Sequence, residues 1–176
     1  MDVLRIGDKL ISRGKLRRII DRILEARAAG SSQQEVANQI GTDRTFISRL
    51  ETLGEVRKGK RVALIGFPIK NKEELLEVAR SEGVDYSLIF TDDERWDFLD
   101  TKSSVELFNQ VLELIGHFRE YDRVIFLGSD MRVELVEGIL GADSVIAVTL
   151  GPSPVTKSVY VDPEAIREII RHVKGH

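Results

Sequence analysis

The sequence predicts an α/β protein built from two units, an all-α unit over residues 1–59 and an α/β unit over residues 60–176. Near the amino terminus, apolar residues recur every three or four positions, which is typical of amphipathic helices. Beyond residue 60, short apolar runs alternate with amphipathic segments, which is typical of a parallel sheet covered by helices. The charge changes at the same place: residues 1–60 carry 13 Lys and Arg against 8 Asp and Glu, whereas residues 61–176 carry 13 against 21. Net charges of +5 and −8 indicate that the two units have different partners.

The composition excludes several classes of protein. The 176 residues include only 14 Gly and 4 Pro and are 31% charged, which excludes collagen-like and low-complexity chains. Cysteine is absent, so disulfides, thiolate catalysis and cysteine-ligated zinc are excluded together. There is no run of the roughly 18 apolar residues that cross a bilayer, and no signal-peptide pattern begins the chain. We therefore expect a cytoplasmic protein without a membrane partner.

The first helix of the all-α unit is expected at about residues 15–28. Its apolar positions recur at helical spacing, while Arg, Glu and Asp fill the other face. Gly30 is expected to end it. The inward-facing residues would be Leu16, Ile19, Ile20, Ile23 and Leu24. The preceding segment, residues 3–11, fits either a strand or a helix.

Two shorter helices follow. Ser32 and Glu35 have the spacing of a capping box, which begins a helix that we expect to end at Gly41. Asp43 is a good N-cap for a third helix, which is expected to run to Gly54 and to turn Phe46, Ile47 and Leu50 inward. Residues 55–60 are charged and too short for another helix, so we expect a linker there.

The α/β unit is expected to repeat a strand–helix pattern. Strands are predicted at about residues 61–66, 86–90, 123–127 and 144–149, and helices at about 72–82, 105–118, 132–140 and 163–173. The strands are continuous apolar runs, which are typical of a sheet buried on both faces. The pattern favours a Rossmann-like, three-layer domain with a mainly parallel sheet.

Residues 32–54 meet the steric demands of a helix-turn-helix. Ala37 is small at the position where the two helices approach most closely, and Gly41 tolerates the positive φ that the turn needs. Ile47 and Leu50 follow at the spacing that buries one face of the third helix against the second. An ordinary helical hairpin with a glycine turn is the alternative interpretation.

This segment resembles the Cro and phage-repressor (XRE-like) family of helix-turn-helix DNA-binding domains. The matching residues are Ser32-Gln33, Val36-Ala37, Gly41, Ile47-Ser48 and Glu51. That family usually continues with two more helices, whereas here a strand is expected soon after the third helix. The resemblance implies a sequence-specific transcriptional regulator whose partner is double-stranded DNA.

The exposed face of the third helix, over about residues 44–53, would then enter the major groove. Arg44 and Arg49 are candidates for a bidentate contact with guanine, and Thr45 and Ser48 for contact with a base edge or a thymine methyl. Gln33 resembles the family's phosphate-binding glutamine.

Candidate phosphate contacts are Thr42 and Lys58, together with Arg57 and Lys60. Their ordinary alternatives are surface roles, since Arg49 is also placed to pair with Glu51 or Asp43 and Lys58 lies in the expected linker. A single helix reads few base pairs, so we expect a homodimer on half-sites about 34 Å apart or a multiple of that distance.

Ligands of open parallel sheets bind beyond the carboxyl ends of the strands. The candidate ligand-binding residues at these ends are Gly66, Phe67, Pro68, Thr91, Asp92, Gly128, Ser129, Asp130, Gly151 and Ser153. Amides at Gly128–Asp130 are placed to hold a phosphate or carboxylate. The alternative is that Ser129 or Asp130 caps the following helix.

Residues 91–99 are expected to form an acidic, solvated loop that contains the only tryptophan, Trp96. With Phe98, Trp96 would be a lid over a ligand, a packing anchor or a subunit contact. The alternative for the carboxylates of this loop is acid–base catalysis or the binding of Mg²⁺. The histidines, His117, His172 and His176, lack metal-ligand spacing. We expect no metal and no cofactor.

No catalytic motif supports an enzyme, and neither GxGxxG nor a P-loop is present. The preferred interpretation is a transcriptional regulator whose α/β unit binds a small effector or dimerises. The alternative is an α/β enzyme acting on a nucleotide or phosphorylated metabolite, with a helical adaptor. A third possibility is a plain interaction module.

Overall fold

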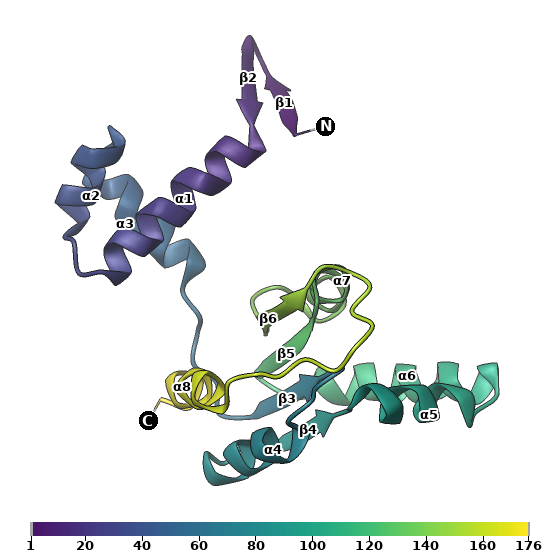
Figure 1. Ribbon diagram of the computed structural model, residues 1–176. Helices are drawn as coiled ribbons and strands as arrows, with labels where there is room; N and C mark the ends of the chain where they lie inside the picture. The colour runs from purple at the N-terminus through teal and green to yellow at the C-terminus, as the bar shows by residue number, and fades with distance from the viewer. Residues whose placement is uncertain (1, 176) are drawn as a thin grey trace. The chain divides into compact units, whose positions relative to one another are not determined.

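The computed structural model describes residues 2–175, which divide after Glu55 into two units (Figure 1). The first unit contains β1 (Val3–Ile6), β2 (Lys9–Ser12), α1 (Arg13–Ala28), α2 (Gln33–Ile40) and α3 (Arg44–Gly54). The second contains β3 (Val62–Gly66), α4 (Lys72–Ser81), β4 (Tyr86–Ile89), α5 (Asp92–Asp100), α6 (Ser104–Phe118), β5 (Arg123–Ser129), α7 (Asp130–Leu140), β6 (Val145–Gly151) and α8 (Pro163–Lys174).

The first unit is not all-α, because residues 3–12 form a hairpin. β1 and β2 pair in antiparallel register, with Leu4 opposite Ile11 and Ile6 opposite Lys9. Gly7 has φ of 58° in the two-residue turn between them, a left-handed conformation that tight hairpin turns require. The expectation of an all-α unit is therefore wrong at its amino terminus.

Three helices form the core of the first unit. The fully buried residues are Ile23 of α1, Val36 and Ala37 of α2, and Ile47 of α3. Ile19, Ala26, Ile40 and Leu50 pack around them.

Three residues that were expected to face inward are exposed. Leu16 and Leu24 of α1 are 49% and 47% exposed, and Phe46 of α3 is 44% exposed. The buried stripe of α1 is narrower than the sequence suggests, because the residues of α1 that pack in this core are Ile19, Ile23 and Ala26. On α3, Phe46 lies about 100° around the helix from Ile47, so it flanks the interface.

The expected linker mostly belongs to the second unit. The Gly59 amide donates to the Val173 carbonyl at 2.9 Å, and the Arg123 side chain donates to the Arg57 carbonyl at 2.6 Å. The amides of Lys60 and Arg61 also donate to one carboxylate oxygen of Asp122. The boundary therefore lies after Glu55 and not after residue 59.

The second unit is mixed α/β with a four-stranded sheet. All its neighbouring strands are parallel, and their order is β4-β3-β5-β6. Alternate residues of β3 face opposite sides: Val62 and Leu64 pack with α4 and α8, whereas Ala63 and Ile65 pack with α6 and α7. Helices thus cover both faces of the sheet, as three layers require.

The expected acidic loop at residues 91–99 is wrong, because Asp92–Asp100 is helical. Thr91 is its N-cap, and the side chain of Glu94 accepts from the Thr91 amide at 2.9 Å, which completes a capping box. The carboxylates of the first turn also interact favourably with the helix dipole. The acidic run is thus the start of a helix.

One ion-pair cluster joins the end of α4 to α8. Glu82 is held by Arg167 at 2.7 Å and by Arg171 at 2.9 Å, and its side chain is 9% exposed. Hydrogen bonds from Arg171 and then Arg167 lower the pKa of Glu82. A depressed pKa contributes stability that is present above the unfolded value, about 4.3, and is lost as pH falls.

We therefore expect Glu82→Gln to flatten the acid side of the stability curve. Between about pH 5 and pH 3, the free energy of unfolding of the second unit should fall less steeply in the variant than in the wild type. Urea titrations at several pH values, followed by the fluorescence of Trp96, measure this. Glu77→Gln, at an exposed pair with Arg80, is the matched control. Parallel curves for Glu82→Gln and the wild type would contradict the assignment.

Candidate functional site

The turn between α2 and α3 is defined by local hydrogen bonds. The Gly41 and Thr42 amides both donate to the Ala37 carbonyl, at 3.0 and 2.9 Å. Gly41 has φ of 78°, the left-handed conformation that favours glycine. Asp43 then caps α3 by accepting from the Phe46 amide at 2.8 Å. These contacts fix where α3 starts relative to α2.

The expected DNA-binding residues of the first unit lie on or near α3. Arg44, Thr45 and Arg49 are exposed, whereas Gln33, Thr42 and Ser48 are half-buried. Ile47 faces the opposite way, into the core. Lys58 lies in the second unit, as do Arg57 and Lys60, so the structure does not place them with this group.

A polar network ties Gln33 to the neighbouring helices. Glu51 of α3 accepts from Arg27 of α1 at 2.5 Å and from the side-chain Nε2 of Gln33 at 2.7 Å. These hydrogen bonds, Arg27 first, lower the pKa of Glu51. The Arg44 side chain donates to the side-chain Oε1 of Gln33 at 3.3 Å. Among residues 2–175, Arg49 forms no ion pair, so the alternative pairing with Glu51 or Asp43 is not seen.

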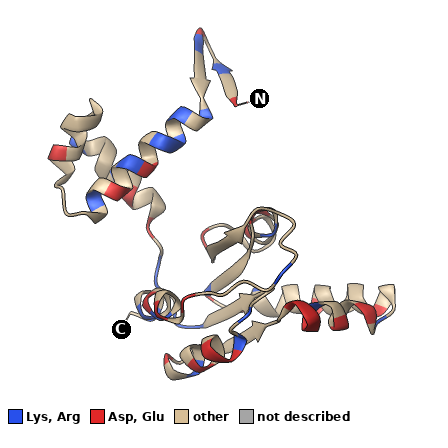
Figure 2. Ribbon diagram, viewed as in Figure 1, with Lys and Arg blue, Asp and Glu red and all other residues tan. Residues whose placement is uncertain are grey.

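The basic charge of the first unit is concentrated on α1. Figure 2 shows Lys and Arg repeatedly along this helix, and Asp and Glu along α4, α5 and α6. The exposed basic residues of α1 are Arg13, Lys15, Arg17, Arg18 and Arg22. α3 adds Arg44 and Arg49.

At the carboxyl edge of the sheet, Ser129, Asp130 and Ser153 come together. Asp130 accepts from the amides of Met131 at 2.7 Å and Ser153 at 2.8 Å, and these bonds lower its pKa. The Ser153 hydroxyl donates to the Ser129 hydroxyl at 2.7 Å. Ser129 occupies the N-cap of α7 without a side-chain capping bond. The Asp130 carboxylate thus already accepts hydrogen bonds from two of the amides that a bound anion would use.

The other expected ligand residues at this edge make contacts within the protein. A Cβ on Gly128 would lie 2.6 Å from the Phe126 ring, and one on Gly66 would lie 3.2 Å from Leu127, so these glycines allow close packing. Thr91 caps α5, the Asp92 amide donates to Ser158, and Pro68 accepts from Val159. Gly151 ends β6.

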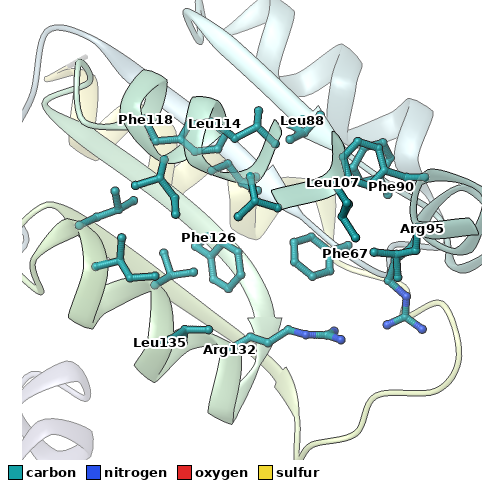
Figure 3. Close-up of a pocket in the computed structure, with 18 residues that line it drawn as sticks. Phe67, Leu88, Phe90, Arg95, Leu107, Leu114, Phe118, Phe126, Arg132 and Leu135 are labelled. Carbon is teal, nitrogen blue, oxygen red and sulfur yellow. The ribbon is translucent and has the colours of Figure 1, made fainter. Parts of the chain in front are cut away.

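An open cavity of about 370 Å³ lies on the sheet face that carries α6 and α7 (Figure 3). Sixteen of its eighteen lining residues are apolar, and they come from the sheet and from α5, α6 and α7. Phe67 is the only expected ligand residue among them, and its ring packs edge-on against Phe126 at 5.7 Å. The two polar lining residues are Arg95 and Arg132.

Both arginines have buried nitrogens without a partner among the described residues, namely Arg95 Nε and Arg132 Nη1. Arg95 is 9% exposed and pairs with Asp92 at 2.5 Å. The Arg132 guanidinium lies 5.1 Å from the centre of the Phe67 ring. Burial, and then the charge of Arg95, lowers the pKa of Arg132. Figure 3 shows both side chains at the end of the cavity near Phe67.

Sequence reasoning missed this cavity, although a signal was present. Thr91 and Glu94 have the same spacing as the capping box at Ser32 and Glu35, and so indicate a helix from residue 92. On that helix Arg95, Phe98 and Leu99 share one face. All three line the cavity.

Within residues 2–175, the structure also bears on metal-ion sites and on membrane-spanning helices. No group of three His, Cys, Asp or Glu residues is placed to hold a metal ion. His117 donates or accepts at the Tyr121 hydroxyl, while His176 lies outside the described residues. No helix there has the length and apolar character needed to span a membrane. Comparison with protein-family models, curated proteins and solved structures finds no match to this chain.

Proposed function

We propose that this chain is a sequence-specific DNA-binding transcriptional regulator, in which α3 enters the major groove. The observation that carries the proposal is the arrangement of α2 and α3. Gly41 is in the left-handed conformation, Ile47 is buried against α2, and Arg44, Thr45 and Arg49 remain in solvent. A short helix with solvent-facing Arg and Thr side chains is suited to contact base edges.

The network around Glu51 supports this proposal, because it orients side chains near the start of α3. Gln33 is held by Glu51, and its side-chain Oε1 accepts from Arg44. The Gln33 side chain is thereby fixed beside the N-terminus of α2, where helix amides favour a phosphate. The basic residues of α1 supply sequence-independent attraction to DNA.

The α/β unit is proposed to dimerise and to bind a small effector. A single recognition helix covers too few base pairs for high specificity, so two copies on half-sites about 34 Å apart are expected. Effector binding would act by changing how the two recognition helices are spaced. Sedimentation showing a monomer both free and on its DNA would contradict this part of the proposal.

The test begins by selecting bound sequences from a random duplex pool with the full chain. On the selected site, Arg44→Ala and Ser48→Ala should each weaken binding and relax one base position, by about 1–3 kcal/mol for a base contact. Fluorescence anisotropy at several salt concentrations measures both affinity and salt slope. Far-UV circular dichroism checks that each variant folds.

Lys58→Ala is the matched comparison. If Lys58 contacts a phosphate, its replacement by alanine should weaken binding to all DNA sequences alike and reduce the salt slope by about one. Selection that enriches no sequence would contradict the proposed function, as would unchanged binding by both α3 variants.

A further inference from the structure

Two arginines at one end of the cavity have buried N–H groups that find no acceptor among the described residues. A guanidinium keeps its charge in proteins, so a buried N–H without an acceptor is costly. Arg95 donates to Asp92 and to the Val155 carbonyl, yet within residues 2–175 its Nε has no acceptor, and neither has Nη1 of Arg132. Among the described residues, Asp92 is the only carboxylate that pairs with either arginine. Two positive charges therefore face one negative charge.

The rest of the cavity is apolar. Phe90, Leu107 and Leu114 are typical of its walls, and a volume of about 370 Å³ is within the range of small-molecule sites. An apolar space of this kind gives water too few hydrogen-bond partners to be held well. Its complement is a molecule with an apolar body and a charge at one end.

The topology places this charged end where parallel sheets bind ligands. β3 and β5 are neighbours, yet the helices that follow them, α4 and α7, cover opposite faces of the sheet. This is a topological switch point, outside which ligands of open α/β sheets bind. Phe67 directly follows β3, and Arg132 lies near the start of α7 after β5.

We propose that this cavity binds an amphipathic anion, with its carboxylate or phosphate between Arg95 and Arg132 and its apolar body along Leu107 and Leu114. The identification of this molecule as the effector of a DNA-binding regulator rests on the proposed function. Binding itself needs no DNA.

A second copy of the chain is the competing occupant. Phe108 and Leu112 of α6 and Leu135 of α7 are exposed large apolar residues. A second copy that packs through these three residues would cover apolar surface, but none of their side chains supplies an acceptor for the two guanidinium groups. For that reason the charged end favours a small anion, and the test separates the two.

Binding is measured with the full chain and short-chain probes kept below their micelle concentrations. Decanoate and decyl phosphate are the two anionic probes, and decanol is the neutral one. Titration calorimetry and the fluorescence of Trp96, whose ring lies 5.1 Å from the Arg95 guanidinium, report binding. We expect saturable binding of an anionic probe, at least about tenfold tighter than decanol. The better of the two anions identifies the headgroup.

Chain length tests the apolar part. From octanoate to decanoate, each added methylene should tighten binding about fourfold, as expected when it is buried. Val111→Trp should block both acids by filling the cavity. Val111 lines it and is 42% exposed, so a larger side chain has room to fold.

Arginine variants test the charged end. Arg132→Met and Arg95→Met should weaken decanoate about tenfold to a hundredfold and leave decanol unchanged. Arg80→Met, at an exposed arginine of α4, is the control and should change neither. Without ligand, Arg132→Met should unfold at the same or a higher temperature, because it removes a buried donor for which the described part of the chain offers no acceptor.

Several outcomes would overturn the inference. These are no saturable binding of either anion, equal affinity for decanoate and decanol, or equal loss of both probes in the arginine variants. A dimer that Phe108→Glu disrupts, in a chain that binds no probe, would assign the cavity to a second copy. Decanoate binding by a chain that binds no specific DNA would overturn the proposed function alone. DNA binding without anion binding would overturn the inference alone.

Discussion

Replacing Ile47 by alanine is expected to unfold the first unit and to leave the second unit folded. Ile47 is fully buried against Val36 and Ala37 of α2 and Ile23 of α1, in a core of few fully buried residues. Truncation of a buried Ile costs about 2–5 kcal/mol, because transfer energy is lost and a cavity remains. A unit of about 55 residues has little stability to spare.

The aromatic residues allow the two units to be followed separately. The single Trp and all three Tyr lie in the second unit, so intrinsic fluorescence at long wavelength reports that unit alone. Helical circular dichroism reports both units together, and methyl NMR signals of core residues such as Ile23 and Val36 report the first unit alone. Leu53→Ala, at an 86% exposed position of the same helix, is the control and should change stability by less than about 0.5 kcal/mol. A folded first unit in Ile47→Ala would contradict the described core.

Asn71→Ala is expected to produce the largest loss of stability among polar substitutions in the second unit. The Asn71 side chain donates to the Val161 carbonyl at 2.8 Å and accepts from the Val161 amide at 3.0 Å, and both residues are buried. Alanine leaves two buried backbone groups without partners, each at a cost of about 1–3 kcal/mol. We expect a total loss of about 2–4 kcal/mol.

Urea denaturation followed by Trp96 fluorescence measures this loss. Glu73→Ala, two residues away on the exposed side of α4, should change stability by less than about 0.5 kcal/mol. Equal midpoints for the two variants would show that the Asn71 bridge does not stabilise the unit. The bridge joins the segment after β3, which carries Phe67, to the chain that leads into α8. Asn71→Ala should therefore also weaken decanoate binding, whereas Glu73→Ala should not.

The parallel sheet and α2–α3 could be predicted because their signals are local. Val62–Gly66 is a continuous apolar run, as a strand buried on both faces must be, and it is β3. The capping box at Ser32 and Glu35 and the glycine at position 41 mark both ends of α2. The side chains and backbone of a few consecutive residues determine these features.

The elements that were missed depend on weaker or non-local signals. The acidic run at Asp92–Glu94 is consistent with a solvated loop, and only the capping box shows that it begins a helix. The hairpin at residues 3–12 depends on one turn glycine, Gly7, and buries none of the core. No local pattern places Arg132 of α7 near Arg95 of α5. The two helices follow different strands, β5 and β4, and the strand order of the sheet decides how close they lie.

The anchored segment from Val56 to Lys60 has a consequence for dividing the chain into fragments. A second-unit fragment that starts at residue 60 would lack the Gly59 amide that donates to Val173 near the end of α8. It would also lack the Arg57 carbonyl that accepts from Arg123 at the start of β5. The last turn of α8 and the entrance to a central strand would both lose a tether. An autonomous second unit therefore starts at Val56, although composition alone marks the change several residues later.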